Sequence, residues 1–183
     1  MKKILISNSK VIIKKFIFHH INNEYINWLN DDKINQYSEH RHYKHTKKTA
    51  IKYCKSRQNN DHYKMLFMAL HDARKNCHHF GNMHAYIDEF NKSADLSIMI
   101  GDLNYHNIGY GRICWLLGIK YLFDNLKLRL VTAKTMSENM NMINLMKKSK
   151  MSINCKVKDF FLNNRKKVDL VIATKFNVKF KIK

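Results

Sequence analysis

Apolar and polar positions follow two different periods along the chain, and these periods predict a mixed order of strands and helices. Runs of apolar, β-branched or aromatic residues, some strictly alternating with polar ones, predict strands. These runs cover residues 11–18, 64–71, 81–87, 94–101, 129–133, 153–164 and 166–176. Capping residues followed by apolar residues at helical spacing predict helices over residues 23–30, 46–58 and 112–124. A fourth helix is expected to start after Ser137, which would be its cap, with Glu138 in its first turn. This order predicts an α/β fold of the α+β type with one mixed sheet.

A glycine pair precedes the most apolar of these helices. Residues 112–124 are apolar on almost every side, so this helix is expected to be buried against a sheet. The chain has 5 glycines in 183 residues, yet Gly109 and Gly111 are one residue apart just before it. Glycines at a helix start let backbone N–H groups approach a phosphate, and the helix dipole adds partial positive charge there. The motifs GxxxxGK[ST] and GxGxxG are absent, because Ile113 and Cys114 follow where a third glycine would fall.

Length and charge narrow the possible functions. The length predicts one domain over residues 1–183. The net charge of +20 would suit nucleic acid, but basic residues are distributed from Lys2 to Lys183 and form no block, so a nucleic-acid partner is not expected. A distributed positive charge instead favours a small anionic ligand, such as one that carries nucleotide phosphates.

Cysteine and histidine positions argue against disulfides and against a metal site. The 4 cysteines show no C-x-x-C spacing. The run "HRHYKH" at residues 40–45 has no acidic or cysteine ligands at a defined spacing, so it is expected to form a loop surface, and no metal is expected. The sequence shows no signal peptide and no apolar run long enough to span a membrane, which predicts a cytoplasmic protein with reduced thiols and no membrane partner.

Two motifs make the chain resemble the GNAT superfamily of N-acetyltransferases. The sequence "HNIGYG" at residues 106–111 is similar to the family's phosphate loop, Q/R-x-x-G-x-G/A, with His106 in the first position. The sequence "NMNMINLMKKSKM" at residues 139–151 is similar to a second family pattern, Asn-x-x-Ala/Ser-x-x-x-Tyr/Phe-Glu-Lys-x-Gly-Phe. The resemblance covers about residues 11–176. It implies a GNAT fold, with a central mixed sheet of about seven strands, about four flanking helices and a splay between strands 4 and 5.

The resemblance also implies acetyl-CoA as co-substrate and suggests which residues contact it. The loop amides that hold the pyrophosphate in the family belong here to Asn107, Ile108, Gly109, Tyr110, Gly111 and Arg112. Pantetheine is expected to pair with the exposed backbone of the splayed strand, around Ile98, Met99 and Ile100. Asn139 is expected to hydrogen-bond the same arm. The tyrosine that often acts as general acid falls on Met146, which cannot donate a proton, so a mechanism without a strong acid is expected.

A further match, "EYINWLNDDKINQYSEHR" at residues 24–41, resembles the opening of GNAT enzymes from bacterial and viral sugar-nucleotide pathways. It implies N-acetylation of a small molecule, a nucleotide-linked amino deoxysugar, by a monomer or homodimer. The general base must lie near the splayed strands. Asp95 stands where relatives place an acidic residue, and His84 carries an imidazole, a common general base. Glu39 lies in the loop that is expected to cover the substrate.

Three other functions remain open from the sequence. An acetyltransferase for a protein N-terminus, a ribosomal protein or a polyamine would share the cofactor motifs, although a basic surface disfavours a cationic substrate. A nucleic-acid-binding module would need a clustered basic face with interleaved aromatic residues. A related domain that binds CoA without catalysis is compatible with Met146 and Lys150, which depart from the family pattern.

Overall fold

The computed structural model describes residues 3–58 and 64–181, and the strands of this part form one mixed sheet in the order β1-β2-β3-β4-β5-β6-β8-β7. Neighbouring strands are antiparallel except β5 and β6, which are parallel. The strands are β1 (Ile4–Ser7), β2 (Val11–Lys15), β3 (Lys64–Asp72), β4 (His78–Asp88), β5 (Ser93–Ile100), β6 (Leu130–Met136), β7 (Ser152–Asn163) and β8 (Lys166–Phe176). The helices are α1 (Asn23–Asn30), α2 (Asp32–Asn35), α3 (Lys47–Gln58), α4 (Tyr110–Asp124) and α5 (Met140–Lys148), with short 3-10 helices η1 (Phe18–His20), η2 (Glu39–His42) and η3 (Leu103–Tyr105).

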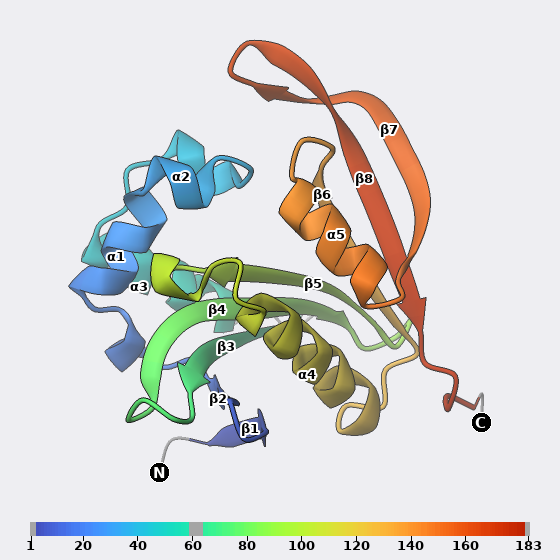
Figure 1. The fold of residues 1–183 in the computed structure, drawn as a ribbon, viewed down its shortest axis with the longest axis horizontal. Coiled ribbons are helices and arrows are strands. Elements are labelled where there is room, and N and C mark those ends of the chain that lie inside the picture. Colours follow the sequence, from blue (N-terminus) through green and yellow to red (C-terminus); the bar gives the residue numbers. More distant parts are fainter. Residues whose placement is uncertain (1–2, 59–63, 182–183) are drawn as a thin grey trace.

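Helices cover both faces of this sheet (Figure 1). Successive residues of a strand point to opposite faces, so β3 sends Met68 and Leu70 into one core and Ala69 into the other. The first core lies under α4 and α5, where Trp115 and Met146 are fully buried. The second core packs α1 and α3 against the opposite face. The apolar helix predicted from the sequence is therefore buried against the sheet, as expected.

The parallel pair of β5 and β6 is short, and this divides the sheet along its middle. The register runs from Ser93 opposite Leu130 to Asp95 opposite Thr132 and then stops. β5 continues to Ile100, while in Figure 1 β6, β8 and β7 rise away from it. Beyond Asp95, β5 therefore has no strand partner on its β6 side among the described residues. The family resemblance predicts this splay between strands 4 and 5. Those two strands, expected from the sequence over residues 94–101 and 129–133, correspond to β5 and β6.

Three of the sequence-based expectations about the elements need correction. The described sheet has eight strands rather than about seven, because Ile4–Ser7 pairs with β2 as an edge strand that its short sequence pattern does not predict. The strand expected over residues 11–18 ends at Lys15, because the chain turns into η1, where His20 Nδ1 accepts a hydrogen bond from the Ile17 amide at 2.9 Å. The described residues also form five α-helices rather than about four, since the four-residue α2 follows α1 directly.

Two helix starts differ as well. α4 begins at Tyr110 rather than at residue 112, so Gly111 belongs to its first turn. α5 begins at Met140, and its N-cap is Asn139 rather than Ser137, because the Asn139 side chain accepts the hydrogen bond of the Met142 amide at 3.1 Å.

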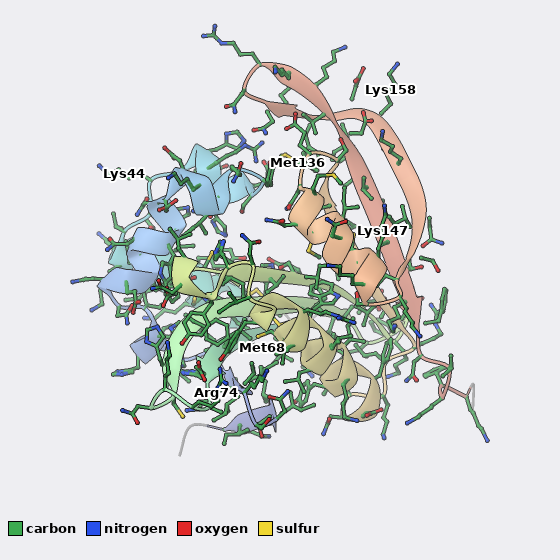
Figure 2. All side chains as sticks on the ribbon, in the orientation of Figure 1. Lys44, Met68, Arg74, Met136, Lys147 and Lys158 are labelled. Carbon is green, nitrogen blue, oxygen red and sulfur yellow. The ribbon has the colours of Figure 1, made fainter. Side chains whose placement is uncertain are left out.

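Basic side chains project from separate parts of the molecule. Figure 2 labels Lys44 after η2, Arg74 between β3 and β4, Lys147 on α5 and Lys158 on β7. This distribution agrees with the absence of a basic block from the sequence. In the part of the chain that the structure describes, no helix combines the length and apolar character needed to cross a membrane.

Candidate active site

The connection between β5 and α4 presents a row of backbone amides. The N-cap of α4, Gly109, has a left-handed backbone with a φ of 90°, which glycine adopts without a Cβ penalty. No acceptor among the described residues bonds the amides of residues 107–112. These N–H groups stand at the positive end of the dipole of a 15-residue helix. The geometry is that of an anion site at a helix N-terminus.

Gly111 leaves room between this helix start and the splayed strand. A Cβ on Gly111 would meet only the Cγ1 of Ile100, at 3.8 Å, which is an ordinary contact. The position beside Gly111 therefore opens toward the end of β5. A larger side chain there would occupy space that the protein's own packing does not use.

A buried carboxylate is hydrogen-bonded to residues on both sides of the loop that precedes α4. Asp72, the last residue of β3, is fully buried and accepts hydrogen bonds from the hydroxyls of Tyr105 at 3.1 Å and Tyr110 at 2.9 Å. Tyr105 ends η3 and Tyr110 begins α4, so the two phenols bracket residues 106–109. Arg74 donates to the Tyr110 hydroxyl. Burial alone would raise the pKa of Asp72, but the Arg74 amide, the two hydroxyls and the Arg74 charge lower it below its usual value.

His106 ties the loop to the splayed strand. Its Nε2 donates to the carbonyl oxygen of Ile100 at 2.8 Å, since a carbonyl can only accept. The following residue, Asn107, has a left-handed backbone with a φ of 59°. The structure therefore brings the expected pantetheine strand, at Ile98, Met99 and Ile100, next to the expected phosphate loop.

α5 supplies less to the site than its motif suggests. The Oδ1 of Asn139 is engaged as the helix cap, which leaves the amide N–H donors of that side chain to contact a ligand. Met146 is fully buried in the core under α4 and α5. This position therefore carries no proton donor, as the sequence indicates.

Polar side chains from β4, β5 and α3 gather on the opposite face of β5. His84 and Ser97 are cross-strand partners, and His84 Nε2 lies 2.7 Å from Ser97 Oγ. The rings of His84 and Tyr86 are 5.2 Å apart, and the Tyr86 hydroxyl lies 2.8 Å from that of Tyr53 on α3. Ser97 follows Asp95, the last β5 residue paired with β6, by two positions. The His84–Ser97 pair therefore borders the splay.

Asp95 shares this face, at the apex of the splay. Its carboxylate lies 2.9 Å from the Nζ of Lys134 on β6. The two side chains are 34% and 52% exposed, so the pair is solvated and contributes little to stability. A substrate amine would have to compete with Lys134 for this carboxylate, which makes Asp95 a poorer base than its position suggests.

Glu39 lies apart from both groups. Its side chain is 66% exposed and pairs with Arg41 at 2.9 Å inside η2. Arg41 also donates to the carbonyl oxygen of Leu162 on β7 at 3.2 Å, so η2 reaches from α2 to the β7–β8 hairpin. This agrees with a covering loop, but no contact joins Glu39 to the His84–Ser97 pair among the residues described.

Several residues at the site escaped the sequence analysis, namely Ser97, Lys134, Tyr53, Tyr86 and Asp72. One usable signal existed for Ser97, because a residue two positions after Asp95 must share its face of a strand. The same signal existed for Tyr86, which lies two positions after His84 on β4. The other three come from elements that are distant in sequence and become neighbours only through the strand order.

Chemically, the arrangement suits two different tasks on the two sides of β5. The amide row and the open strand edge can bind a long anionic ligand. When the His84 ring carries its proton on Nδ1, Nε2 can accept the Ser97 proton while Ser97 Oγ takes one from a nucleophile. The pair therefore has the chemistry needed to pass a proton along the edge of the splay.

The chain matches a known protein family and shares its fold with several solved structures. Residues 10–152 match the family described as "Acetyltransferase (GNAT) domain". Spermidine N-acetyltransferase from Vibrio cholerae, in complex with CoA and spermine, superimposes with a TM-score of 0.83 at 17% identity, over 94% of this chain and 98% of that chain. A ribosomal L7/L12 alpha-N-protein acetyltransferase in complex with CoA gives 0.83 at 11% identity, over 95% and 98%.

A microcin C7 self-immunity acetyltransferase in complex with acetyl-CoA and AMP gives a TM-score of 0.77 at 14% identity, over 93% of this chain and 94% of that chain. At such identities the three solved structures establish a shared fold. A search of the curated proteins gives no significant match.

Proposed function

Because the chain belongs to the acetyltransferase (GNAT) domain family, we propose that it acetylates the amino group of a nucleotide-linked amino deoxysugar. Family membership establishes GNAT-type acetyl transfer, and the acceptor is the proposed part. The observation that carries the acceptor class is the charge of the acceptor face. Its carboxylate, Asp95, is already paired with Lys134, in a protein of net charge +20. Such a face favours an anionic acceptor over a cationic one.

Acetyl-CoA takes the α4 side of β5 in this proposal. Its pyrophosphate accepts hydrogen bonds from the amides of residues 107–112, and its pantetheine arm lies along Ile98, Met99 and Ile100. The free amides and the missing strand partner support this placement, because a bound pyrophosphate and a peptide-like arm would satisfy both. The Asn139 amide group then donates to the arm from α5.

The acceptor amine enters from the face that carries His84 and Ser97. The amine nitrogen attacks the thioester carbonyl, a C–N bond forms, and the C–S bond breaks to release the CoA thiolate. The excess amine proton passes to Ser97 Oγ as Ser97 gives its own proton to His84 Nε2. Solvent protonates the thiolate, because Met146 replaces the family's tyrosine. A sugar amine is less basic than a lysine amine, so one imidazole is sufficient as base.

Three comparisons bear on the acceptor. The microcin self-immunity acetyltransferase was solved in complex with acetyl-CoA and AMP, which supports room for a nucleotide in this fold. The spermidine enzyme shares the same fold, but a polyamine would need carboxylates on the acceptor face. The ribosomal-protein enzyme keeps a protein N-terminus as the second candidate acceptor, because a neutral α-amine makes no demand for acidic residues.

The test is CoA release by the purified protein with 3-amino and 4-amino deoxysugar nucleotides, a peptide N-terminus and spermidine. We expect turnover with a sugar nucleotide and little with spermidine. Acetylation of the peptide alone would replace the proposal with the second candidate. Acetylation of spermidine alone would show that the charge argument is wrong.

We also propose a cytoplasmic location, in line with the sequence-based expectation. All four cysteines are free thiols, namely Cys54, Cys77, Cys114 and Cys155, which suits a reducing compartment. Fractionation of the source cells with an antibody against the protein would test this.

A further inference from the structure

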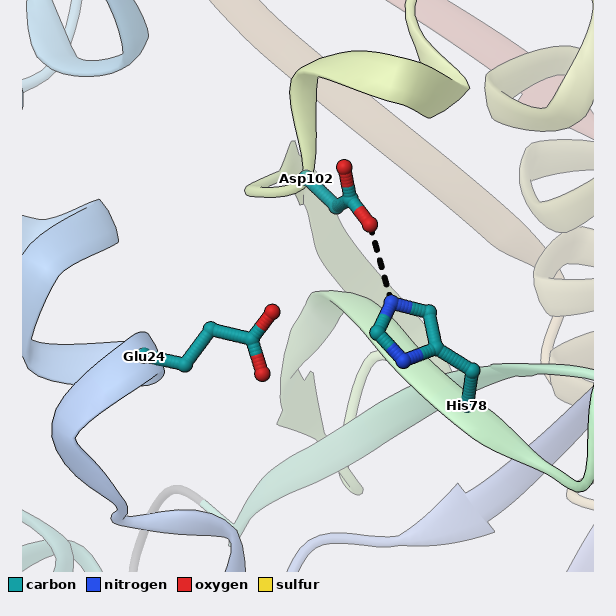
Figure 3. A group of neighbouring side chains, drawn as sticks. All are labelled: Glu24, His78 and Asp102. Atoms are coloured by element: carbon teal, nitrogen blue, oxygen red, sulfur yellow. Dashed lines mark hydrogen bonds and ion pairs between the residues drawn. The ribbon is translucent and has the colours of Figure 1, made fainter.

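Three potential metal ligands converge at a corner of the fold away from the His84–Ser97 pair. Glu24 on α1, His78 at the start of β4 and Asp102 just after β5 each offer one ligand atom, and all three atoms lie within 4.8 Å of one another. Figure 3 shows the carboxylate of Glu24 pointing toward the imidazole of His78 and the carboxylate of Asp102. His78 Nε2 and Asp102 Oδ2 are 2.8 Å apart.

Two of the three ligands are held in place by their surroundings. Asp102 Oδ1 accepts hydrogen bonds from the amide and the side chain of Asn104, both at 3.0 Å, which directs Oδ2 toward His78. The Asp102 amide donates to the carbonyl of Phe80 at 3.0 Å. The His78 ring stacks on Tyr105, with centroids 5.8 Å apart. The positions of Nε2 and Oδ2 are therefore set before any ligand binds, which lowers the cost of binding.

The third ligand, Glu24, differs from carboxylates such as Asp95 and Asp169, which lysine side chains neutralise. Glu24 forms no ion pair with Lys or Arg among the described residues. Instead it faces a second carboxylate across a histidine. Two negative groups this close repel each other unless a positive charge lies between them.

We infer that Glu24, His78 and Asp102 form a site for one divalent transition-metal ion, with Zn²⁺ the best match. One imidazole and two carboxylates are a ligand set that Zn²⁺ accepts, with water in the remaining position. At metal–ligand distances of about 2.1 Å, neighbouring ligand atoms lie roughly 3.0–3.4 Å apart. The 2.8 Å between Nε2 and Oδ2 is close to this spacing, and small side-chain rotations bring the third ligand into range.

The ion would join three separate elements at the entrance to the phosphate loop. Asp102 caps η3, and η3 ends one residue before His106. A bound ion therefore ties the first turn of α1 to the corner from which the phosphate loop starts. Its role is structural, and it takes no part in the transfer of the acetyl group. The inference does not depend on the acceptor or on catalysis, so either proposal can fail without the other.

The experiment measures Zn²⁺ binding to the full-length protein after treatment with a chelator. Titration calorimetry should show one Zn²⁺ per chain, and Zn²⁺ should raise the melting temperature. Glu24→Gln and His78→Gln should each weaken the site by at least about tenfold. The matched control is His45→Gln, because His45 Nε2 lies 3.3 Å from His40 Nδ1 and this pair is the obvious competing zinc site. The control should bind Zn²⁺ as the wild type does.

Anomalous diffraction from Zn²⁺-soaked crystals would locate the ion directly, with a peak expected about 2.1 Å from His78 Nε2. A peak between His40 and His45, or loss of binding in His45→Gln but not in His78→Gln, would overturn the assignment. A rise in melting temperature with Mg²⁺ equal to that with Zn²⁺ would also overturn the assignment. Such a result would mean that the ion only screens the two carboxylates, without binding the imidazole.

Discussion

On one side of β5 the candidate site consists mainly of backbone groups, whereas on the other it consists of side chains from separate elements. The α4 side presents the amides of residues 107–112 and the unpaired edge of the strand. The opposite side presents His84 from β4, Ser97 from β5 and Tyr53 from α3. The cofactor half thus consists of groups that are close in sequence, supported from a distance by Asp72, whereas the acceptor half depends on long-range topology throughout.

This difference predicts that the two halves respond differently to substitution. An amide row depends on a few glycines and a helix start, and most side chains elsewhere leave it intact. A proton relay depends on two side chains that meet across a strand pair, so one substitution changes its chemistry. Perturbing the α4 side should therefore change cofactor affinity or stability, and perturbing the opposite side should change turnover.

The largest effect is expected for Asp72→Asn, on the α4 side. The native carboxylate accepts two hydroxyl hydrogen bonds in a buried position, and such bonds to a charged group are each worth about 1.5–3 kcal/mol. We expect a loss of unfolding free energy on the order of 3 kcal/mol. Because the two phenols bracket the phosphate loop, CoA affinity should fall as well. Urea denaturation and CoA titration measure the two effects.

The same variant tests the pKa of Asp72. Its folded-state pKa lies below the unfolded value, so the group stabilises the fold above about pH 4 and loses that contribution as the pH falls through the folded-state pKa. The stability difference between wild type and Asp72→Asn should therefore shrink on acidification below about pH 4. The lowest pH in this test is about 2.5, on the order of a unit below the usual pKa of an Asp side chain. If the difference in unfolding free energy between the two proteins stays constant down to that pH, the charge of the Asp72 carboxylate has no role in stability.

On the opposite side, His84→Asn should lower kcat by about 100-fold, which is typical for loss of a general base. Acetyl-CoA affinity should not change, because the imidazole lies on the acceptor face. Asp95→Asn is the matched comparison, since it removes a carboxylate that Lys134 already engages. If Asp95→Asn lowers kcat more than His84→Asn does, the base is Asp95 and the relay through Ser97 is wrong.

Most of the fold could be predicted because its signals are local. The strong apolar helix, the alternating strand at residues 94–101 and the cap at α1 all follow from short-range patterns. The edge strand β1 was missed because four residues with a partly exposed pattern carry too little periodicity. The strand at residues 11–18 was extended too far because Phe16 and Phe18 continue its composition after the chain turns.

The candidate site divides in the same way. The phosphate loop was predictable from Gly109 and Gly111, since the backbone φ of 90° at Gly109 favours glycine there. The role of Asp72 was not, because its partners Tyr105 and Tyr110 are 33 and 38 residues away. His84 was a candidate, but its partner depends on the register that sets it opposite Ser97, which a sequence pattern does not determine.

Gly111→Val should weaken CoA binding about tenfold, roughly 1.4 kcal/mol, with little loss of stability. A Cβ at this position meets only Ile100 Cγ1, at 3.8 Å, so the valine side chain is expected to enter the space that the ligand would use. Gly111→Ala adds a single methyl group and should have a smaller effect in the same direction. Titration with CoA and a thermal melt separate the two quantities. Unchanged CoA affinity in a folded Gly111→Val protein would remove the pyrophosphate from this position.

The smallest effect is expected at Asn139, where a cap and a cofactor contact share one side chain. Asn139→Ala loses both functions: the cap is worth about 0.5–2 kcal/mol of stability, and the contact about 0.5–1.5 kcal/mol of binding. Asn139→Asp keeps an oxygen to cap the Met142 amide but has no N–H to donate. We therefore expect Asn139→Asp to melt like the wild type and to show a KM for acetyl-CoA raised a few-fold. If its KM is unchanged while Asn139→Ala is destabilised, Asn139 serves α5 alone, and the pantetheine contact belongs to the edge of β5.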